Sequence, residues 1–132
     1  MLNITKTIEY ALIAIRHINN NGKERLCTSK EIANLYNLPK ERLAKIMQQL
    51  CKSGYLETIK GAYGGYFLKK RLKHISLIDF IETLEGPVGV VNCTANLDCS
   101  IIDMCNIKSP INKINNNIRK VLSDVSLQEI TT

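Results

Sequence analysis

Three cysteines in the last third of the chain are the residues best suited to chemistry. Cys93, Cys99 and Cys105 stand at two equal intervals of six residues in the stretch VNCTANLDCSIIDMC, residues 91–105. Residues six apart on a helix point about 240° apart, so the three thiols can converge only if this segment is a loop. Such thiols can bind a metal ion or an iron–sulfur cluster, or act as a redox switch.

An iron–sulfur cluster fits this spacing better than zinc does. A zinc site usually shows a closer Cys-x2-Cys pair and four evident ligands, and the segment has neither. Three thiolates at longer, equal gaps suit a bulkier group, so we expect an iron–sulfur cluster. Its fourth ligand then comes from a residue other than Cys, from a partner chain or from a small molecule. Two alternatives stay open: buried structural thiols, and a thiol-redox or zinc switch without a cluster.

The other two cysteines and the two histidines are not expected to be ligands of this site. Cys27 and Cys51 fall in or beside predicted helices, where a lone Cys is usually a small core residue. His17 and His74 are expected to be packing or surface residues. Neither pair is assigned to a metal site.

Composition indicates one globular domain, with or without an appended element. The chain has 132 residues, 45% of them hydrophobic, and five Cys. No apolar run reaches the roughly 18 residues of a membrane span, and no signal peptide is evident, so we expect a cytoplasmic protein that does not bind membranes. In that reducing compartment, clustered Cys indicate metal or redox chemistry rather than structural disulfides.

Positive charge is concentrated in the middle of the chain. Residues 39–74 carry nine Lys and Arg against two acidic residues, a net +7, whereas residues 75–132 are at −3. A basic surface of this kind is expected where a protein meets the phosphates of nucleic acid. DNA contact and the cysteines are therefore expected in different parts of the chain.

Three helices are predicted before residue 55, in NITKTIEYALIAIRHINN, TSKEIANLYN and PKERLAKIMQQLCKSG. The second opens with Thr28-x-x-Glu31, which has the form of a capping box, and is expected to bury Leu35 or Tyr36 beside its other apolar residues. Pro39 suits the first position of the third helix. Two helices joined by so short a turn indicate a helix-turn-helix.

A β-hairpin and two more helices are predicted after that. YLETIK and YFLKK have strand composition and flank the glycine-rich GAYGG, so a wing is expected to follow the helix-turn-helix. SLIDFIETLEGP indicates one capped helix. In the last helix Ser109 is expected to be the cap and Pro110 to lie in the first turn, and its apolar stripe suits dimerisation. The predicted fold is thus mainly α with a small wing, divided into residues 1–86 (DNA binding), 87–108 (cysteine loop) and 109–132 (dimerisation helix and tail).

The third helix has the properties of a recognition helix, whose N-terminal end enters the major groove. Arg42 or Lys45 can pair with guanine edges, and Glu41 can accept from a cytosine amine. The residues expected to contact DNA are Lys6, Thr28, Lys40, Glu41, Arg42, Lys45, Lys60 and Tyr63. A basic face that docks an acidic protein is the alternative. No Ser-His-Asp order, phosphate loop or paired carboxylate set is present, so we do not expect an enzyme.

The same residues resemble the Rrf family of bacterial winged-helix iron–sulfur transcription regulators. EYALIAI, the stretch SKEIANLYNLPKERLAKIMQQLCKSGYLETIKGAYGGYFL, LEGP and the triple Cys carry the resemblance, which covers nearly the whole chain. It implies a homodimeric repressor that holds a [2Fe-2S] or [4Fe-4S] cluster, binds a double-stranded DNA operator and senses cluster, iron, redox or nitric-oxide status. The phrase LEGPVGVVNC is similar to regulators of SUF-type assembly operons, which implies control of iron–sulfur assembly genes.

The resemblance also implies particular ligands. Cys93, Cys99 and Cys105 match the three cluster ligands of the family. Assembly repressors complete the site with a His three places after the last Cys, where this chain has Lys108. Nitric-oxide-sensing members use a carboxylate just before a Tyr on the first helix of the other subunit, and Glu9 matches that position. In the wing, Lys60 falls where the family has an arginine that reads DNA.

Overall fold

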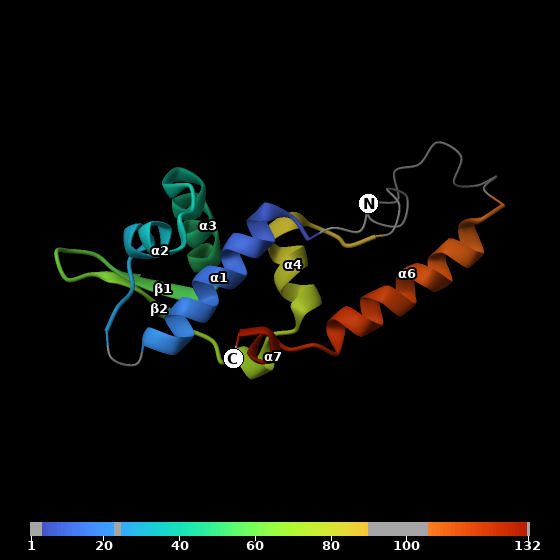
Figure 1. The fold of residues 1–132 in the computed structure, drawn as a ribbon. Coiled ribbons are helices and arrows are strands. Elements are labelled where there is room, and N and C mark those ends of the chain that lie inside the picture. The colour runs from blue at the N-terminus through green and yellow to red at the C-terminus, as the bar shows by residue number, and fades with distance from the viewer. Residues whose placement is uncertain (1–3, 23–24, 90–105, 132) are drawn as a thin grey trace.

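The computed structural model describes residues 4–22, 25–89 and 106–131 of the chain. It contains the predicted winged helix-turn-helix (Figure 1). In chain order its elements are α1 (Lys6–Asn21), α2 (Ser29–Tyr36), α3 (Lys40–Lys52), β1 (Leu56–Ile59), β2 (Gly65–Leu68), the 3-10 turn η1 (Leu72–His74), α4 (Leu77–Glu85), α6 (Lys108–Ser123) and α7 (Leu127–Thr131). The fold class, mainly α with a two-stranded wing, is confirmed. Within these ranges no helix is both long and apolar enough to cross a membrane.

Local capping sets the ends of the helix-turn-helix. The backbone N–H of Glu31 donates to the Thr28 hydroxyl at 3.0 Å, so Thr28 is the predicted cap of α2. Asn37 ends α2 in the left-handed conformation, with φ of 54°, which Asn tolerates better than most residues. Pro39 is the residue before α3 and not its first helical position, a shift of one place from the prediction. Proline lacks an N–H, so either place costs no helix hydrogen bond.

The buried face of α2 is narrower than predicted. Ile32 and Ala33 are buried, but Leu35 and Tyr36 are 63% and 42% exposed, so the expectation that one of them is buried was wrong. A helix of eight residues has one short inward face, and two adjacent residues already fill it here.

The wing packs tightly against the strand-like segment before α2. β1 and β2 are antiparallel, with Leu56 opposite Leu68 and Ile59 opposite Gly65. The Tyr66 N–H donates to the Cys27 carbonyl at 2.7 Å. A Cβ on Gly65 would lie 2.8 Å from that same carbonyl oxygen, so the close approach requires glycine at this position.

The last helix returns to the core, which was not predicted from sequence. α7 packs on α1 and η1, and its Leu127 is fully buried. The connection before it is held by backbone hydrogen bonds, from the Leu77 N–H to the Val125 carbonyl at 2.8 Å and from the Leu127 N–H to the Ile75 carbonyl at 2.9 Å. The end of the chain therefore belongs to the same core as the winged helix.

Between α4 and α7, the long helix α6 extends away from the winged helix (Figure 1) and packs mainly against α4. Arg119 of α6 forms an ion pair with Glu82 of α4 and donates to the Val88 carbonyl at 3.1 Å. The hydrogen bond from Arg119 holds the pKa of Glu82 below its usual range. Ser109 lies inside the first turn of α6 and the cap position is Ile107, so the predicted cap was wrong.

Candidate functional site

The exposed face of α3 carries the predicted base-reading residues. Leu43, Ile46, Met47 and Leu50 are buried on the opposite face, which fixes the rotation of the helix. The side chains of Lys40, Glu41, Arg42 and Lys45 are all exposed. They occupy the first half of α3, the part that a recognition helix inserts into the groove.

Arg42 also contacts α1. Its Nη2 donates to the Thr7 hydroxyl at 3.2 Å, and its guanidinium lies over the ring of Tyr10, 5.4 Å from the centroid. A guanidinium has five N–H donors, so these contacts orient Arg42 and still leave capacity for a guanine edge. Arg42 therefore lies at the junction of α1 and α3.

The remaining DNA candidates lie around this face. Lys60 and Tyr63 belong to the hairpin connection, which projects from the domain in Figure 1, and Tyr63 is 96% exposed. Thr28 is exposed but already caps α2. Lys6 pairs with Glu9 at 2.9 Å, and the hydrogen bond to that carboxylate raises the pKa of Lys6. Because Tyr63 packs on almost nothing in the described chain, its side chain is free to meet a ligand surface.

The predicted cofactor ligands are only partly described. Cys93, Cys99 and Cys105 lie outside the described residues. Glu9 is on the first turn of α1 with its side chain 44% exposed. The Thr5 hydroxyl, which caps α1, donates to Glu85 at the end of α4 with a distance of 2.7 Å. The first turn of α1 therefore lies beside the end of α4, after which the chain leads to the cysteine segment.

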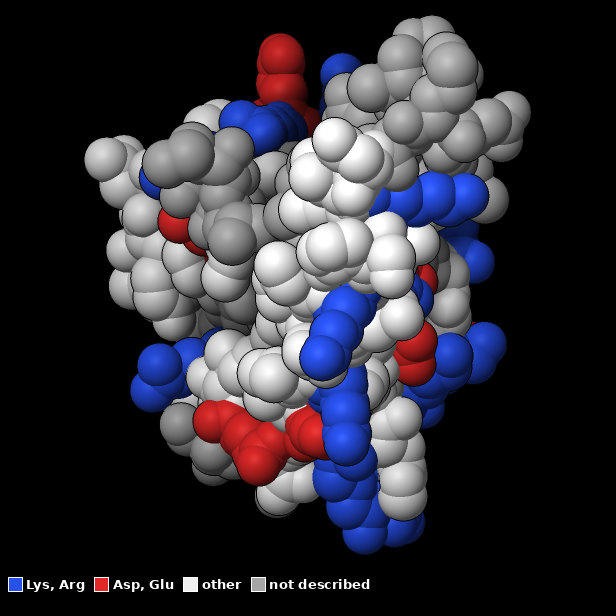
Figure 2. All heavy atoms as spheres, turned by 90° about the vertical axis from the view of Figure 1, so that its right-hand side faces the viewer, with Lys and Arg blue, Asp and Glu red and all other residues white. Residues whose placement is uncertain are grey.

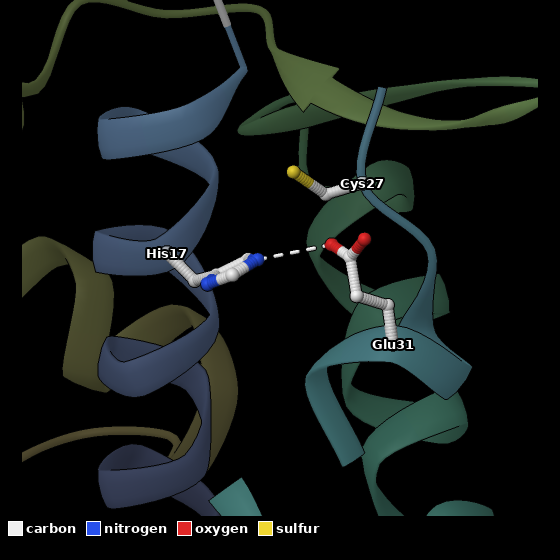
Figure 3. Close-up of side chains that lie close together, drawn as sticks. All are labelled: His17, Cys27 and Glu31. Atoms are coloured by element: carbon white, nitrogen blue, oxygen red, sulfur yellow. Dashed lines mark hydrogen bonds and ion pairs between the residues drawn. The ribbon is translucent and has the colours of Figure 1, made fainter. Parts of the chain in front are cut away.

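A second group of potential ligands was missed from sequence. His17, Cys27 and Glu31 converge between α1 and the start of α2 (Figure 3), and one ligand atom from each lies within 4.8 Å of the others. Cys27 follows His17 by ten positions, and α1 ends between them. No short spacing motif signals this cluster, because tertiary packing alone brings the two segments together.

The three side chains differ in their electrostatics. Burial raises the pKa of the Cys27 thiol, and the Glu31 charge raises it further. Burial acts to raise the pKa of Glu31 as well, but hydrogen bonds from His17 and Arg25 outweigh it and hold that pKa below its usual range. Glu31 is therefore ionised near neutral pH, whereas Cys27 is protonated.

Comparisons with known proteins agree with this architecture. A family model named Rrf2 and described as "Iron-dependent Transcriptional regulator" matches residues 4–132. "Protein aau3" of Rhizobium meliloti (strain 1021) is 28% identical over 131 residues, which are 98% of this chain and 84% of that protein. The structure of CymR, the global cysteine regulator of B. subtilis, is similar with a TM-score of 0.77 and 27% identity, covering 99% of this chain and 97% of CymR. T. potens IscR is similar with a TM-score of 0.73 and 26% identity, covering 98% and 85%.

Proposed function

Because the chain belongs to the Rrf2 family of transcriptional regulators, we propose that it is a repressor whose DNA binding is controlled by an iron–sulfur cluster on Cys93, Cys99 and Cys105. The family and the fold are those of winged-helix DNA-binding transcription regulators and not of enzymes. The observation that carries the cluster assignment is the Cys-x5-Cys-x5-Cys segment in a chain matched by a family described as iron-dependent. Similarity to an IscR structure supports it.

In this proposal each of three segments of the chain has its own function. Residues 1–86 read the operator, residues 87–108 hold the cofactor, and residues 109–132 join two subunits and return to the core. When bound, the cluster supplies a group whose presence or oxidation state changes with iron, redox or nitric-oxide status. The protein responds if one arrangement of its two recognition helices is favoured by a few kcal/mol over the other. Genes for iron–sulfur assembly are the proposed targets.

Measuring the iron and sulfide content of the protein tests the cluster directly. Protein isolated without air is expected to contain iron and acid-labile sulfide in cluster stoichiometry. The second candidate function is a cluster-free thiol-redox or zinc switch on the same winged helix, favoured by the likeness to the B. subtilis cysteine regulator. Iron-free, colourless protein from an anaerobic preparation would contradict the cluster and support the switch.

Exchanging Glu9 for Ala is expected to change the holo spectrum while the cluster is retained on its three thiolates. The carboxylate of Glu9, from the other subunit as in nitric-oxide-sensing relatives, is the proposed fourth ligand, and its loss alters the field at one iron. Absorption and Mössbauer spectra of anaerobic protein measure this. Glu57→Ala, which removes an exposed acid on the wing, is the matched control. Identical spectra for Glu9→Ala and wild type would exclude Glu9 as a ligand.

The homodimer is proposed on the exposed apolar residues of α6. Ile114 and Val121 are 47% and 65% exposed although the helix carries a polar opposite face. Figure 2 looks from the side toward which α6 projects in Figure 1 and shows uncharged surface beside a run of Lys and Arg side chains. A second copy of α6 would cover these apolar side chains and leave the cations at the rim.

Ile114→Glu combined with Val121→Glu is expected to convert the dimer into monomers. Burying an unpaired carboxylate costs about 3 kcal/mol, which raises the dimer Kd about a hundredfold, and each substitution places one such carboxylate in both subunits. Sedimentation equilibrium measures the shift. Lys113→Glu, at an exposed polar position of α6, is the control and should leave the dimer intact. A dimer that survives the double exchange would place the subunit interface elsewhere.

A further inference from the structure

We propose that His17, Cys27 and Glu31 form a binding site for a zinc ion with water as the fourth ligand. The site lies outside the cysteine segment and does not depend on it. His Nε2, Cys Sγ and a carboxylate oxygen are three ligands that Zn²⁺ commonly takes in proteins, and a water in the fourth position is usual where three residues bind. Figure 3 shows the imidazole of α1 pointing toward the carboxylate and the thiol across a narrow gap.

The distances need only small adjustments for a tetrahedral ion. His17 Nε2 lies 3.0 Å from Glu31 Oε2, and no pair of the three ligand atoms is more than 4.8 Å apart. Tetrahedral Zn²⁺ with its usual bond lengths separates neighbouring ligand atoms by about 3.3 to 3.6 Å. The imidazole and carboxylate would therefore part by a few tenths of an ångström, and the thiol would move inward by up to about 1 Å through a rotation about χ1.

Neighbouring side chains already orient two of the three ligands. His17 is buried, and its Nδ1 lies 3.0 Å from the Tyr36 hydroxyl, which leaves Nε2 directed at the gap. Arg25 forms its ion pair with Oε1 of Glu31, so Oε2 is the oxygen that faces His17. Metal-binding histidines usually hydrogen-bond through their second nitrogen, and this outer contact fixes the ring. The Tyr36 hydroxyl fills that role here.

Binding of the ion would move the ring proton of His17 and release the thiol proton of Cys27. The Glu31 carboxylate can only accept, so Nε2 of His17 carries the proton of their hydrogen bond. On binding, Nε2 gives its lone pair to Zn²⁺, the ring proton resides on Nδ1 and is donated to the Tyr36 oxygen, and the Cys27 thiol releases its proton to water. One proton is thus released for each ion that binds to a protein in which His17 is neutral. Because binding releases a proton, affinity for the ion is expected to rise with pH.

The proposed ion would join three elements of the winged helix. His17 comes from α1, Glu31 from the first turn of α2, and Cys27 from the segment paired with Tyr66 of β2. Binding that occurs only in the folded state stabilises it, so Zn²⁺ is expected to raise the melting temperature.

Cobalt titration of the full chain provides the test. In the variant with Cys93, Cys99 and Cys105 replaced by Ser, one equivalent of Co²⁺ is expected to give thiolate charge-transfer and tetrahedral d–d bands, which added Zn²⁺ abolishes. A further Cys27→Ser exchange should remove the charge-transfer band, whereas Cys51→Ser, at a thiol outside the cluster, should leave it. Tyr36→Phe is expected to weaken Co²⁺ binding tenfold to a hundredfold through loss of the outer contact.

Two results would overturn the site. One is the absence of any thiolate band in the Cys93, Cys99 and Cys105 variant, even though circular dichroism shows the native helix content. The other is a band that persists after Cys27→Ser and disappears after Cys51→Ser. If Cys27→Ser unfolds the chain, Glu31→Gln provides the same comparison, with loss of the bands expected and retention of unchanged bands contradicting the proposal. Neither result depends on whether the other three cysteines hold a cluster, so the two proposals fail separately.

Discussion

Replacing Cys93, Cys99 and Cys105 together by Ser is expected to yield colourless protein that contains no iron and no acid-labile sulfide after anaerobic isolation. Serine hydroxyls stay protonated near neutral pH and are poor ligands for iron, so the three thiolates cannot be replaced by this exchange. Metal and sulfide analysis with absorption spectra of anaerobic protein measures the loss. The triple exchange is therefore expected to remove the cluster completely.

The matched control for that loss is Cys51→Ser, which removes one thiol from α3. It should leave iron and sulfide at the wild-type level. Iron and sulfide retained in the triple variant at the wild-type ratio would show that other residues hold the group. Equal loss of iron in the control and in the triple variant would mean that general damage to the fold had been measured.

Arg42→Ala combined with Lys60→Ala is expected to weaken operator binding by about a hundredfold or more. Each side chain is proposed to make a groove or phosphate contact, and a good base contact contributes about 1 to 3 kcal/mol. Loss of two cations should also make the salt dependence of binding shallower by about one to two in the slope of log K against log salt. Binding isotherms at several salt concentrations, on duplexes selected from a random pool by the wild-type protein, measure both effects.

Lys113→Ala with Lys120→Ala is the control, since it removes the same charge from exposed positions of α6. The operator affinity of this control should change much less than that of the Arg42 and Lys60 variant. Equal losses in the two variants would mean that net charge governs binding and that the α3 and wing face has no particular role. Unchanged affinity in the Arg42 and Lys60 variant would move the DNA surface elsewhere.

The winged helix could be predicted from sequence because the residues that determine its elements act locally. The Thr28 cap, the left-handed Asn37 and the glycines of the hairpin each act within a few residues, and the structure contains all of these elements. Leu35 was misjudged because periodicity marks apolar residues but does not say how wide the inward face of a short helix is. α7 was missed because five residues show too little periodicity, and its burial depends on α1 and η1.

The candidate sites also differ in whether local sequence or tertiary packing determines them. The exposed face of α3 follows from helical periodicity, so Arg42 and Lys45 were identified from sequence and the structure places them on the surface. The convergence of His17 with Glu31 depends on how α1 packs against α2, which no spacing rule encodes. Cys93, Cys99 and Cys105 remain predictions from their spacing and from the family.

The contact of Arg42 with Thr7 and Tyr10 has a mechanical consequence. Thr7 and Tyr10 flank Glu9 within a single turn of α1, so the side chain proposed to touch iron and the supports of a base-reading arginine share one rigid piece of backbone. A pull on Glu9 would be transmitted to Arg42 over one helical turn, with no relay through the hydrophobic interior. Signal and readout in this regulator would then be separated by a few ångströms of helix.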